Sequence, residues 1–518
     1  MGANMRGFVS ASFLLLWAAC GGAEGGGGTE AAGTTGATGS SGAEPTTGAA
    51  MLPGSCASPI EPVLSSSARL TVDARGRMID EFGRDVQLRG VNTGGRSKWA
   101  PFVPFPIEAE AELAAVEAAA DEFFARLTGW GINAVRMPFS WEALEPSPGS
   151  YDARYLDRYA AMVDAGWRHR MRVVVDFHQD VYASPFCGDG FPPWTLPGEP
   201  GPPRRDCPNW GLKYVNDPEV RAAFDRFWAD EGQIQGKFVA MWAQMIARVA
   251  DHPGVVGLEI LNEPGWGTAV DLAAWKQAVL TPFHERVIAE MRALAGEEPL
   301  IFYDNPGTDA LGFQEVEHAR PAGEGLVYAP HVYDPGLIQG MPAIGTMPEV
   351  LIGEFATFAA TAGVGVLVGE FGIGDGAPGG EAWLTKALAA IDAGRLGGTL
   401  WECSQSAELW NEEDLSVLAA DGSERATLDV FVRPYLRAVA GAFEQFSWDG
   451  SVATGRWTSD GGVTELALPR RLFGDAEVEV ELTTLAGPAG TCFTLDAERG
   501  ELRVQGPAGA QVEVRVTR

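Results

Sequence analysis

The chain of 518 residues carries a formal net charge of −31 at pH 7, and 46% of its residues are hydrophobic. This length suits one large barrel domain plus a small module, and the apolar fraction is enough for a substantial core. The acidic balance argues against nucleic acid or anionic lipid surfaces as partners, and no apolar run reaches the roughly eighteen residues that a membrane-spanning helix needs.

The first twenty residues resemble an export signal. Arg6 precedes the short apolar stretch Phe8–Ala19, which has the length of a signal-peptide core. The stretch ends in Leu-Trp-Ala-Ala-Cys, similar to a bacterial lipobox with Cys20 as the lipidated residue, although Trp17 stands where an aliphatic residue is usual. Residues 1–20 therefore predict export. The product would be a lipoprotein attached to a membrane through Cys20, at the cell surface or in the periplasm, or else a secreted protein.

Residues 21–55 are dominated by Gly, Ala, Thr and Ser. Such a segment buries too little apolar surface to fold, so we expect a disordered linker. Cysteines beyond it can form disulfides in an exported protein. Cys187 and Cys207 bracket a Pro/Gly-rich loop and are the candidate pair, and no Cys/His spacing predicts a zinc site. The pairing of the other three stays open: Cys56, Cys403 and Cys492.

From Ala68 onward the pattern is that of a repeating α/β protein. Leu70–Asp80 and Glu81–Arg84 predict a hairpin that could close the bottom of a barrel. Eight apolar runs bounded by turn residues then predict buried strands. These are Val86–Asn92, Ala134–Phe139, Arg172–His178, Val255–Asn262, Leu300–Asp304, Leu326–Tyr333, Gly365–Glu370 and Gly398–Cys403. Helical patterns lie between most of them, including Glu108–Gly129, Asp152–Arg168, Glu219–Ala250, Leu272–Leu294 and Glu381–Gly394.

Eight strands alternating with helices predict an α/β fold, a (β/α)8 TIM barrel over residues 60–443. A doubly wound sheet is the alternative, but no Gly-rich phosphate turn supports it. A last helix is expected through about Phe443. The pattern then changes to short runs of period two separated by Gly, Pro and Asp, which predict a small antiparallel β-sandwich over residues 444–518. With few surface aromatics, this module is expected to pack against the barrel rather than bind carbohydrate.

Two of the predicted strands end in a glutamate, Glu263 in one and Glu370 in the other. A carboxylate is costly to bury, and a second carboxylate nearby raises that cost. Cleavage of a glycosidic bond needs such a pair, because one carboxyl protonates the leaving oxygen while the other attacks the sugar or activates water. The alternative is that each glutamate is a structural residue satisfied by an arginine. With the companions below, we favour the glycosidase interpretation.

The carboxyl ends of the strands form the active face of a TIM barrel, so polar residues at strand ends can be considered as one set. The set comprises Arg136, His178, Asp180, Asn262, His331, Tyr333 and Trp401, with Lys98 in the loop after the first strand. Arg136 could instead be a structural ion-pair partner, and Trp401 could belong to the core. His178 between two aspartates is a weak metal-ligand set, so no metal or other cofactor is predicted.

This set, in this order, resembles the retaining glycoside hydrolases of family 5 over roughly Ala68 to Ala440, with Asn262-Glu263-Pro264 as the central motif. The stretch Asp176–Tyr182 is most similar to that of endoglycoceramidases, which release an intact glycan from ceramide. Lys98 after Arg-Gly-Val-Asn and a terminal β-sandwich are similar too.

The resemblance implies a role for each residue. Glu263 would be the acid/base and Glu370 the nucleophile. The remaining roles concern substrate binding and support of the nucleophile. Arg136 and Tyr333 would support Glu370, Asn262 would bind the sugar 2-hydroxyl, His178 and Asp180 would bind hydroxyls in the −1 subsite, and Trp401 would lie under that sugar.

Three loops carry apolar residues: Trp99–Pro106, Phe191–Pro197 and Tyr333–Ile344. They could form an apolar groove for a ceramide-like aglycone, or fold over the barrel. We therefore expect an endo-acting β-glycosidase on glycosphingolipids. One alternative is a β-1,4-glucanase or mannanase on polysaccharide, and another is a non-catalytic, glycan-binding surface lipoprotein. The substrate is then a glycolipid or oligosaccharide, and no protein partner is implied.

Overall fold

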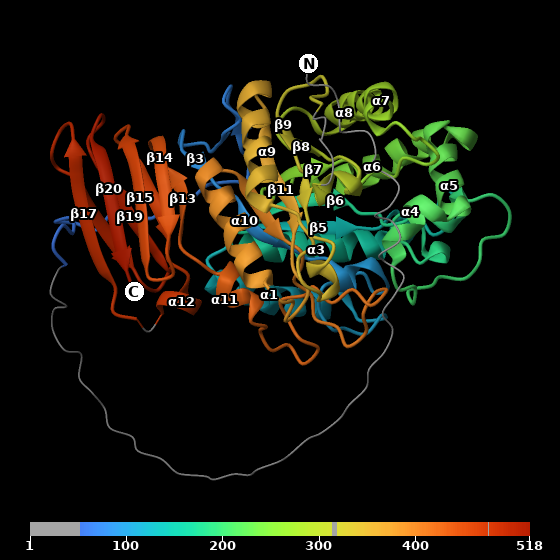
Figure 1. The fold of residues 1–518 in the computed structure, drawn as a ribbon, viewed down its shortest axis with the longest axis horizontal. Helices are drawn as coiled ribbons and strands as arrows, with labels where there is room; N and C mark the ends of the chain where they lie inside the picture. Colours follow the sequence, from blue (N-terminus) through green and yellow to red (C-terminus); the bar gives the residue numbers. More distant parts are fainter. Residues whose placement is uncertain (1–51, 313–318, 475) are drawn as a thin grey trace, which may run out of the picture. The chain divides into compact units, whose positions relative to one another are not determined.

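The computed structural model describes residues 52–312, 319–474 and 476–518 (Figure 1). The predicted signal segment, Cys20 and nearly all of the predicted linker lie outside the described residues. Within those ranges, no helix combines the length and apolar character that crossing a membrane requires.

The described chain forms a closed parallel barrel, as predicted. Its strands are β4 (Arg89–Asn92), β5 (Ala134–Phe139), β6 (Arg172–Phe177), β7 (Val255–Glu259), β8 (Leu300–Tyr303), β9 (Leu326–Tyr328), β10 (His331–Val332), β11 (Gly365–Phe371) and β12 (Gly397–Leu400). Successive strands pair in parallel, β9 and β10 both pair with β11 as one barrel position, and β12 pairs with β4 to close the ring. The strands are buried along their whole length, which explains their continuous apolar sequences.

Helices surround the barrel strands (Figure 1). These helices are α1 (Leu113–Gly129), α2 (Trp141–Leu144), α3 (Ala153–Arg168), α4 (Lys213–Asn216), α5 (Pro218–Trp228), α6 (Ile234–Val249), α7 (Leu272–Trp275), α8 (Thr281–Ala295), α9 (Pro348–Ala362), α10 (Gly380–Gly394) and α11 (Thr427–Phe431). A further short helix, α12 (Arg470–Phe473), lies among the C-terminal strands. The single helix predicted for Glu219–Ala250 is wrong, because α5 and α6 are separate. Asp230 and Gln233 between them have positive φ values of 53° and 58°, which a continuous right-handed helix excludes.

The N-terminal hairpin packs under the barrel. It consists of β1 (Thr71–Val72), β2 (Met78–Ile79) and β3 (Asp85–Val86). Leu70 and Met78 join a buried cluster with residues of the barrel strands, including Val174 and Val256. A side chain at Gly76 would meet the carbonyl oxygen of Val364 at 2.3 Å, so this turn can approach the barrel closely only with glycine.

Two antiparallel sheets follow the barrel. Their C-terminal strands are β13 (Tyr435–Val439), β14 (Gly441–Trp448), β15 (Val452–Ser459), β16 (Val463–Ala467), β17 (Glu479–Ala486), β18 (Cys492–Asp496), β19 (Glu501–Gln505) and β20 (Gln511–Thr517). One sheet has the order β1-β2-β3-β13-β16-β19-β18, and the other has the order β14-β15-β20-β17. The N-terminal hairpin thus belongs to the same sheet as the C-terminal strands.

The helix expected through about Phe443 is wrong, and the residue-444 boundary predicted for the sandwich falls within β14. The segment from Tyr435 to Phe443 is rich in residues that also favour helices, but it forms β13 and the start of β14. Pairing of β13 with β3 and β16 decides its structure, since neighbouring strands override local preference.

The structure contains two disulfides among its described residues. Cys187 pairs with Cys207, the predicted candidate, and Cys56 pairs with Cys492 across 436 residues of sequence. The second pair joins the segment before the hairpin to β18, a proximity that spacing could not indicate. Cys403 is a buried free thiol.

A buried ionic cluster links α10 to β4 and to the residues that precede β4 and β13. Asp392 of α10 accepts hydrogen bonds from Arg89 and from Gln87, and it forms an ion pair with Arg433 at 3.1 Å. Replacing Asp392 with asparagine would leave two buried guanidinium groups without their counter-charge. We expect the free energy of unfolding to fall by about 3–5 kcal/mol, measured by urea denaturation.

The matched control for that change is an exposed ion pair. Lys386 and Glu349 lie 3.2 Å apart with both side chains largely in solvent. Glu349→Gln should therefore change the free energy of unfolding by no more than about 0.5 kcal/mol. A loss below about 1 kcal/mol for Asp392→Asn would show that the buried cluster is not important for stability.

Candidate active site

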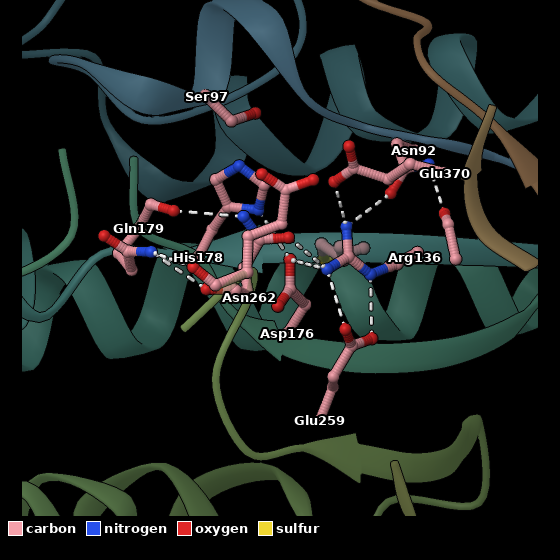
Figure 2. Close-up of polar contacts among 12 residues, drawn as sticks. Asn92, Ser97, Arg136, Asp176, His178, Gln179, Glu259, Asn262 and Glu370 are labelled. Carbon is pink, nitrogen blue, oxygen red and sulfur yellow. Dashed lines mark hydrogen bonds and ion pairs between the residues drawn. The ribbon is translucent and has the colours of Figure 1, made fainter. Parts of the chain in front are cut away.

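Arg136, on β5, is the centre of the polar network inside the barrel mouth (Figure 2). Its guanidinium donates to both oxygens of Glu259, at 2.7 and 2.8 Å, and to Oε1 of Glu370 at 2.7 Å. It also donates to the side-chain oxygens of Asn92 and Asn262 at 2.9 and 2.8 Å. Burial lowers the pKa of Arg136, but the surrounding carboxylates outweigh it and raise that pKa well above its usual value. Arg136 is both a structural ion-pair partner and a direct contact of Glu370.

Glu370, at the end of β11, has a hydrogen-bond donor on each carboxylate oxygen. Arg136 donates to Oε1, and the hydroxyl of Tyr333 donates to Oε2 at 2.9 Å. The Glu370 side chain is 7% exposed, so only a small part of it is accessible to solvent. The guanidinium and the hydroxyl together hold this carboxylate in a defined orientation.

Glu263 lies just after β7 in a different environment. Its backbone N–H donates to Asp304 at 3.1 Å, and its φ of 37° turns the side chain out of the strand direction. Oε1 shares a hydrogen bond of 2.8 Å with Nδ1 of His331. Burial, with the charge of Asp180 as a second cause, raises the pKa of Glu263 to about 7. Burial also lowers the pKa of His331 to about 4, so this imidazole is neutral when Glu263 titrates.

The two glutamates lie close enough to act on one bond. One oxygen of Glu263, one of Glu370 and one ring nitrogen of His331 all lie within 4.8 Å of one another. Retaining glycosidases have carboxyl groups about 5–5.5 Å apart, whereas inverting enzymes need about 6.5–9.5 Å to admit a water molecule. Carboxylate oxygens within 4.8 Å of each other fit the shorter separation of a retaining pair.

These atoms could by distance also surround a metal ion, as could those of Glu259, Asp304 and His331. In both groups, however, the guanidinium of Arg136 lies 2.7 Å from a carboxylate oxygen. A permanent positive charge so close disfavours a second cation. A third group includes Cys187 and Cys207, whose sulfurs are already joined in a disulfide. We assign no metal to any of them.

The second cluster at the barrel mouth contains His178, Asp180 and Lys98. His178 bonds Asp176 through Nδ1 at 2.8 Å, and its Nε2 lies 3.5 Å from Asp180. Burial lowers the pKa of His178, but the two aspartates outweigh it and raise the pKa to about 10. The Lys98 ammonium donates to Asp180 at 2.6 Å. The structure thus brings Lys98, whose position sequence reasoning could not supply, directly to the predicted site.

Trp401 follows β12 and completes this cluster. Its ring stacks on His178 with centroids 5.0 Å apart, and the Lys98 ammonium lies 4.6 Å from the Trp401 ring centroid. Trp401 is only 3% exposed, and a side chain at Gly94 would clash with its ring at 2.5 Å. The ring is therefore both part of a small buried cluster, with Tyr333 among its members, and part of the site wall.

Asn262 is oriented from two sides. Its amide oxygen accepts from Arg136, and its Nδ2 donates to the carbonyl of Gln179 at 3.0 Å (Figure 2). An amide nitrogen has two N–H groups, so one remains for a ligand.

Sequence reasoning left several residues of this network out of the predicted site, Asp176 among them. Glu259 and Asp304 were not chosen, although a charge inside an apolar strand and a carboxylate at a strand end were available signals. Asn92 also stands at a strand end. Glu413, which accepts from the Trp401 indole and lies 3.6 Å from Lys98, comes from a long loop and gave no signal.

The three apolar loops differ in the structure. Val103, Phe105 and Phe191 are buried, so the first two loops mainly fold over the barrel, which was one of the two alternatives that the sequence left open. The third loop exposes Met341 and Ile344 to solvent.

Comparisons with known proteins give a consistent result. The family model described as Cellulase (glycosyl hydrolase family 5) matches residues 79–406, more than half of the chain. Endoglycoceramidase I of Rhodococcus hoagii is 29% identical over 356 residues, covering 64% of this chain and 67% of that protein. A glucosylceramidase of Cryptococcus neoformans is 29% identical over 259 residues, covering 40% of this chain and 35% of that protein. The structure of endo-glycoceramidase II from Rhodococcus sp. with a five-membered iminocyclitol is also similar, with a TM-score of 0.66 and 27% identity. The match covers 85% of this chain and 98% of that chain.

Proposed function

The chain belongs to glycosyl hydrolase family 5, and on that premise we propose that it releases the intact glycan from ceramide in glycosphingolipids, with retention of configuration. The observation that carries the reaction type is the Glu263–Glu370 pair, whose nearest oxygens lie within 4.8 Å. The glycolipid substrate is supported by the relatives named endoglycoceramidase and glucosylceramidase and by the exposed apolar loop after β10.

In the first step, a Glu370 oxygen attacks the anomeric carbon while Glu263 gives its proton to the glycosidic oxygen. The environments suit these roles, because the pKa of Glu263 is raised to about 7 and Glu370 is held by Arg136 and Tyr333. Ceramide leaves as an alcohol, and the glycan stays bound to Glu370 as an ester. In the second step, Glu263 takes a proton from water, which attacks the same carbon and restores Glu370.

The other residues of the site hold the sugar. The second side-chain N–H of Asn262 would donate to the 2-hydroxyl of the sugar, a contact that strengthens as the sugar approaches the transition state. His178 and Asp180 would bind neighbouring hydroxyls, and Lys98 would keep Asp180 charged and fixed. Trp401 would present its face to the apolar side of the pyranose ring.

The test is a product assay with the full chain. Lactosylceramide in detergent, soluble β-glucan and mannan would be offered in parallel, and products identified by mass spectrometry. We expect free ceramide and intact lactose, formed first as the β-anomer by NMR. Cleavage of glucan or mannan alone would support the catalytic roles of the two glutamates but show that the substrate is a polysaccharide. Absence of turnover on all three would contradict the catalytic assignment and favour a glycan-binding protein.

We also propose that the chain is exported. Its described part contains two disulfides, which persist in oxidising compartments and are rare in the cytosol. Fractionation of cells expressing the full chain tests this, with mass spectrometry of the N-terminal peptide to detect acylated Cys20. Recovery of an unprocessed chain in the cytosol would overturn it.

A further inference from the structure

Asp334 lies at the centre of a ring of backbone hydrogen bonds in the loop between β10 and α9. We call residues 334–347 the strand-six loop. The Asp334 carboxylate is buried and accepts six hydrogen bonds from five backbone N–H groups, at 2.9–3.3 Å. The donors are Gly336, Leu337, Ile344, Gly345 and Thr346.

The two oxygens of Asp334 bind different ends of the loop. Oδ1 accepts from Gly336 and Leu337 at its start, and Oδ2 accepts from Gly345 and Thr346 at its end. Ile344 donates to both. Burial raises the pKa of Asp334, but these N–H groups outweigh it and lower the pKa, so the carboxylate stays charged. One buried anion therefore closes the loop.

The loop adjoins the catalytic pair. Tyr333, one residue before Asp334, donates to Glu370. At the other end, the Thr346 hydroxyl donates to the carbonyl of Leu311 at 2.7 Å. Leu311 ends the short helix Gly307–Leu311, and Gly307 lies so close to Glu263 that a side chain there would meet its Oε2 at 2.3 Å. The acid Glu263 protonates the leaving oxygen, so the aglycone departs on the side where this loop is anchored.

The loop presents apolar side chains to solvent. Met341 is 44% exposed, Ile344 is 55% exposed and Met347 is 58% exposed. Three large apolar residues on one short loop thus offer exposed apolar area to a ligand. A mobile loop loses conformational entropy when a ligand binds to it. A loop that is already held in its bound conformation avoids this loss and therefore binds the ligand more tightly.

We propose that Asp334 is a positioning residue that holds the strand-six loop as a platform for the hydrocarbon part of the aglycone. This inference rests on the proposed function, because the occupant it names is the lipid portion of the glycolipid substrate. Glu370 and Glu263 do the chemistry, and Asp334 acts on binding through Met341, Ile344 and Met347.

The Asp334→Asn variant distinguishes a role in aglycone binding from a role in the stability or catalysis of the whole enzyme. The asparagine oxygen can serve one end of the loop, but its NH2 group faces the N–H donors of the other end and cannot accept from them. For lactosylceramide we expect KM to rise by about tenfold, with kcat within about twofold of the wild type. For p-nitrophenyl β-lactoside, a soluble substrate without hydrocarbon chains, both constants should stay within about twofold.

Exposed variants test the platform without threatening the fold. Ile344→Ser and Met347→Ser should reproduce the rise in KM for lactosylceramide, whereas Leu485→Ser, a 43% exposed residue of β17, should not. Equal losses on both substrates for Asp334→Asn, or an unchanged KM for lactosylceramide in both Ile344→Ser and Met347→Ser, would overturn the inference. A wild-type protein active on the soluble lactoside but not on lactosylceramide would instead overturn the glycolipid assignment, and this inference with it.

Discussion

Glu370→Gln is expected to lower kcat on lactosylceramide by at least about 10⁴-fold while leaving the fold intact. Glutamine has nearly the same shape and can still accept from Tyr333, which donates to Oε2 at 2.9 Å in the native protein. Its amide is a poor nucleophile, so the ester with the glycan cannot form. The measurement is steady-state turnover, with the melting temperature as the check on folding.

A second measurement identifies the nucleophile directly. A 2-deoxy-2-fluoro glycoside with a good leaving group should label the wild type on the peptide that contains Glu370, because the fluorine slows release of the intermediate. Glu290→Gln on the exposed face of α8 is the matched control and should retain full activity. Turnover of more than a few per cent in Glu370→Gln, or labelling at another residue, would refute this mechanism.

Glu263→Ala should show a loss that depends on the leaving group. Ceramide leaves as a poorly acidic alcohol and needs the proton, so we expect kcat on lactosylceramide to fall by about 10³-fold. An aryl lactoside with an acidic phenol needs little protonation in the first step, so its first step should be affected far less. Azide, which needs no general base, should restore turnover and give the β-lactosyl azide.

The pH dependence tests the same residue in the wild type. Glu263 must be protonated to act as the acid, and its raised pKa of about 7 keeps the proton on it below that pH. The ratio kcat/KM for lactosylceramide should therefore fall as pH rises above about 7. For the aryl lactoside, this fall of kcat/KM above pH 7 should be much smaller. The same decrease of kcat/KM at high pH for both substrates would show that Glu263 is not the acid/base. A Glu263→Ala variant that azide does not rescue would show the same.

Much of this architecture could be predicted from local sequence. Runs such as Ala134–Phe139 are apolar throughout because both faces of the strand are buried, and β5 has these same bounds. Polar residues at the ends of these runs lie at one mouth of the barrel, because the carboxyl ends of all parallel strands lie at the same face. That rule alone brought Glu263 and Glu370 together.

Local pattern failed where a distant partner decides the structure. The segment from Tyr435 to Phe443 is a strand pair rather than a helix because β3, more than 300 residues earlier, pairs with β13. Only the folded chain joins Cys56 to Cys492.

The sequence by itself determined the barrel, its strand order and the two candidate acids, because these follow from periodicity and from burial along single segments. The tertiary structure alone decided how the acids differ. Glu370 faces Arg136 and Tyr333, while Glu263 faces the neutral His331. It also decided which apolar loop stays exposed. These properties depend on distances between residues far apart in the chain, which no local pattern encodes.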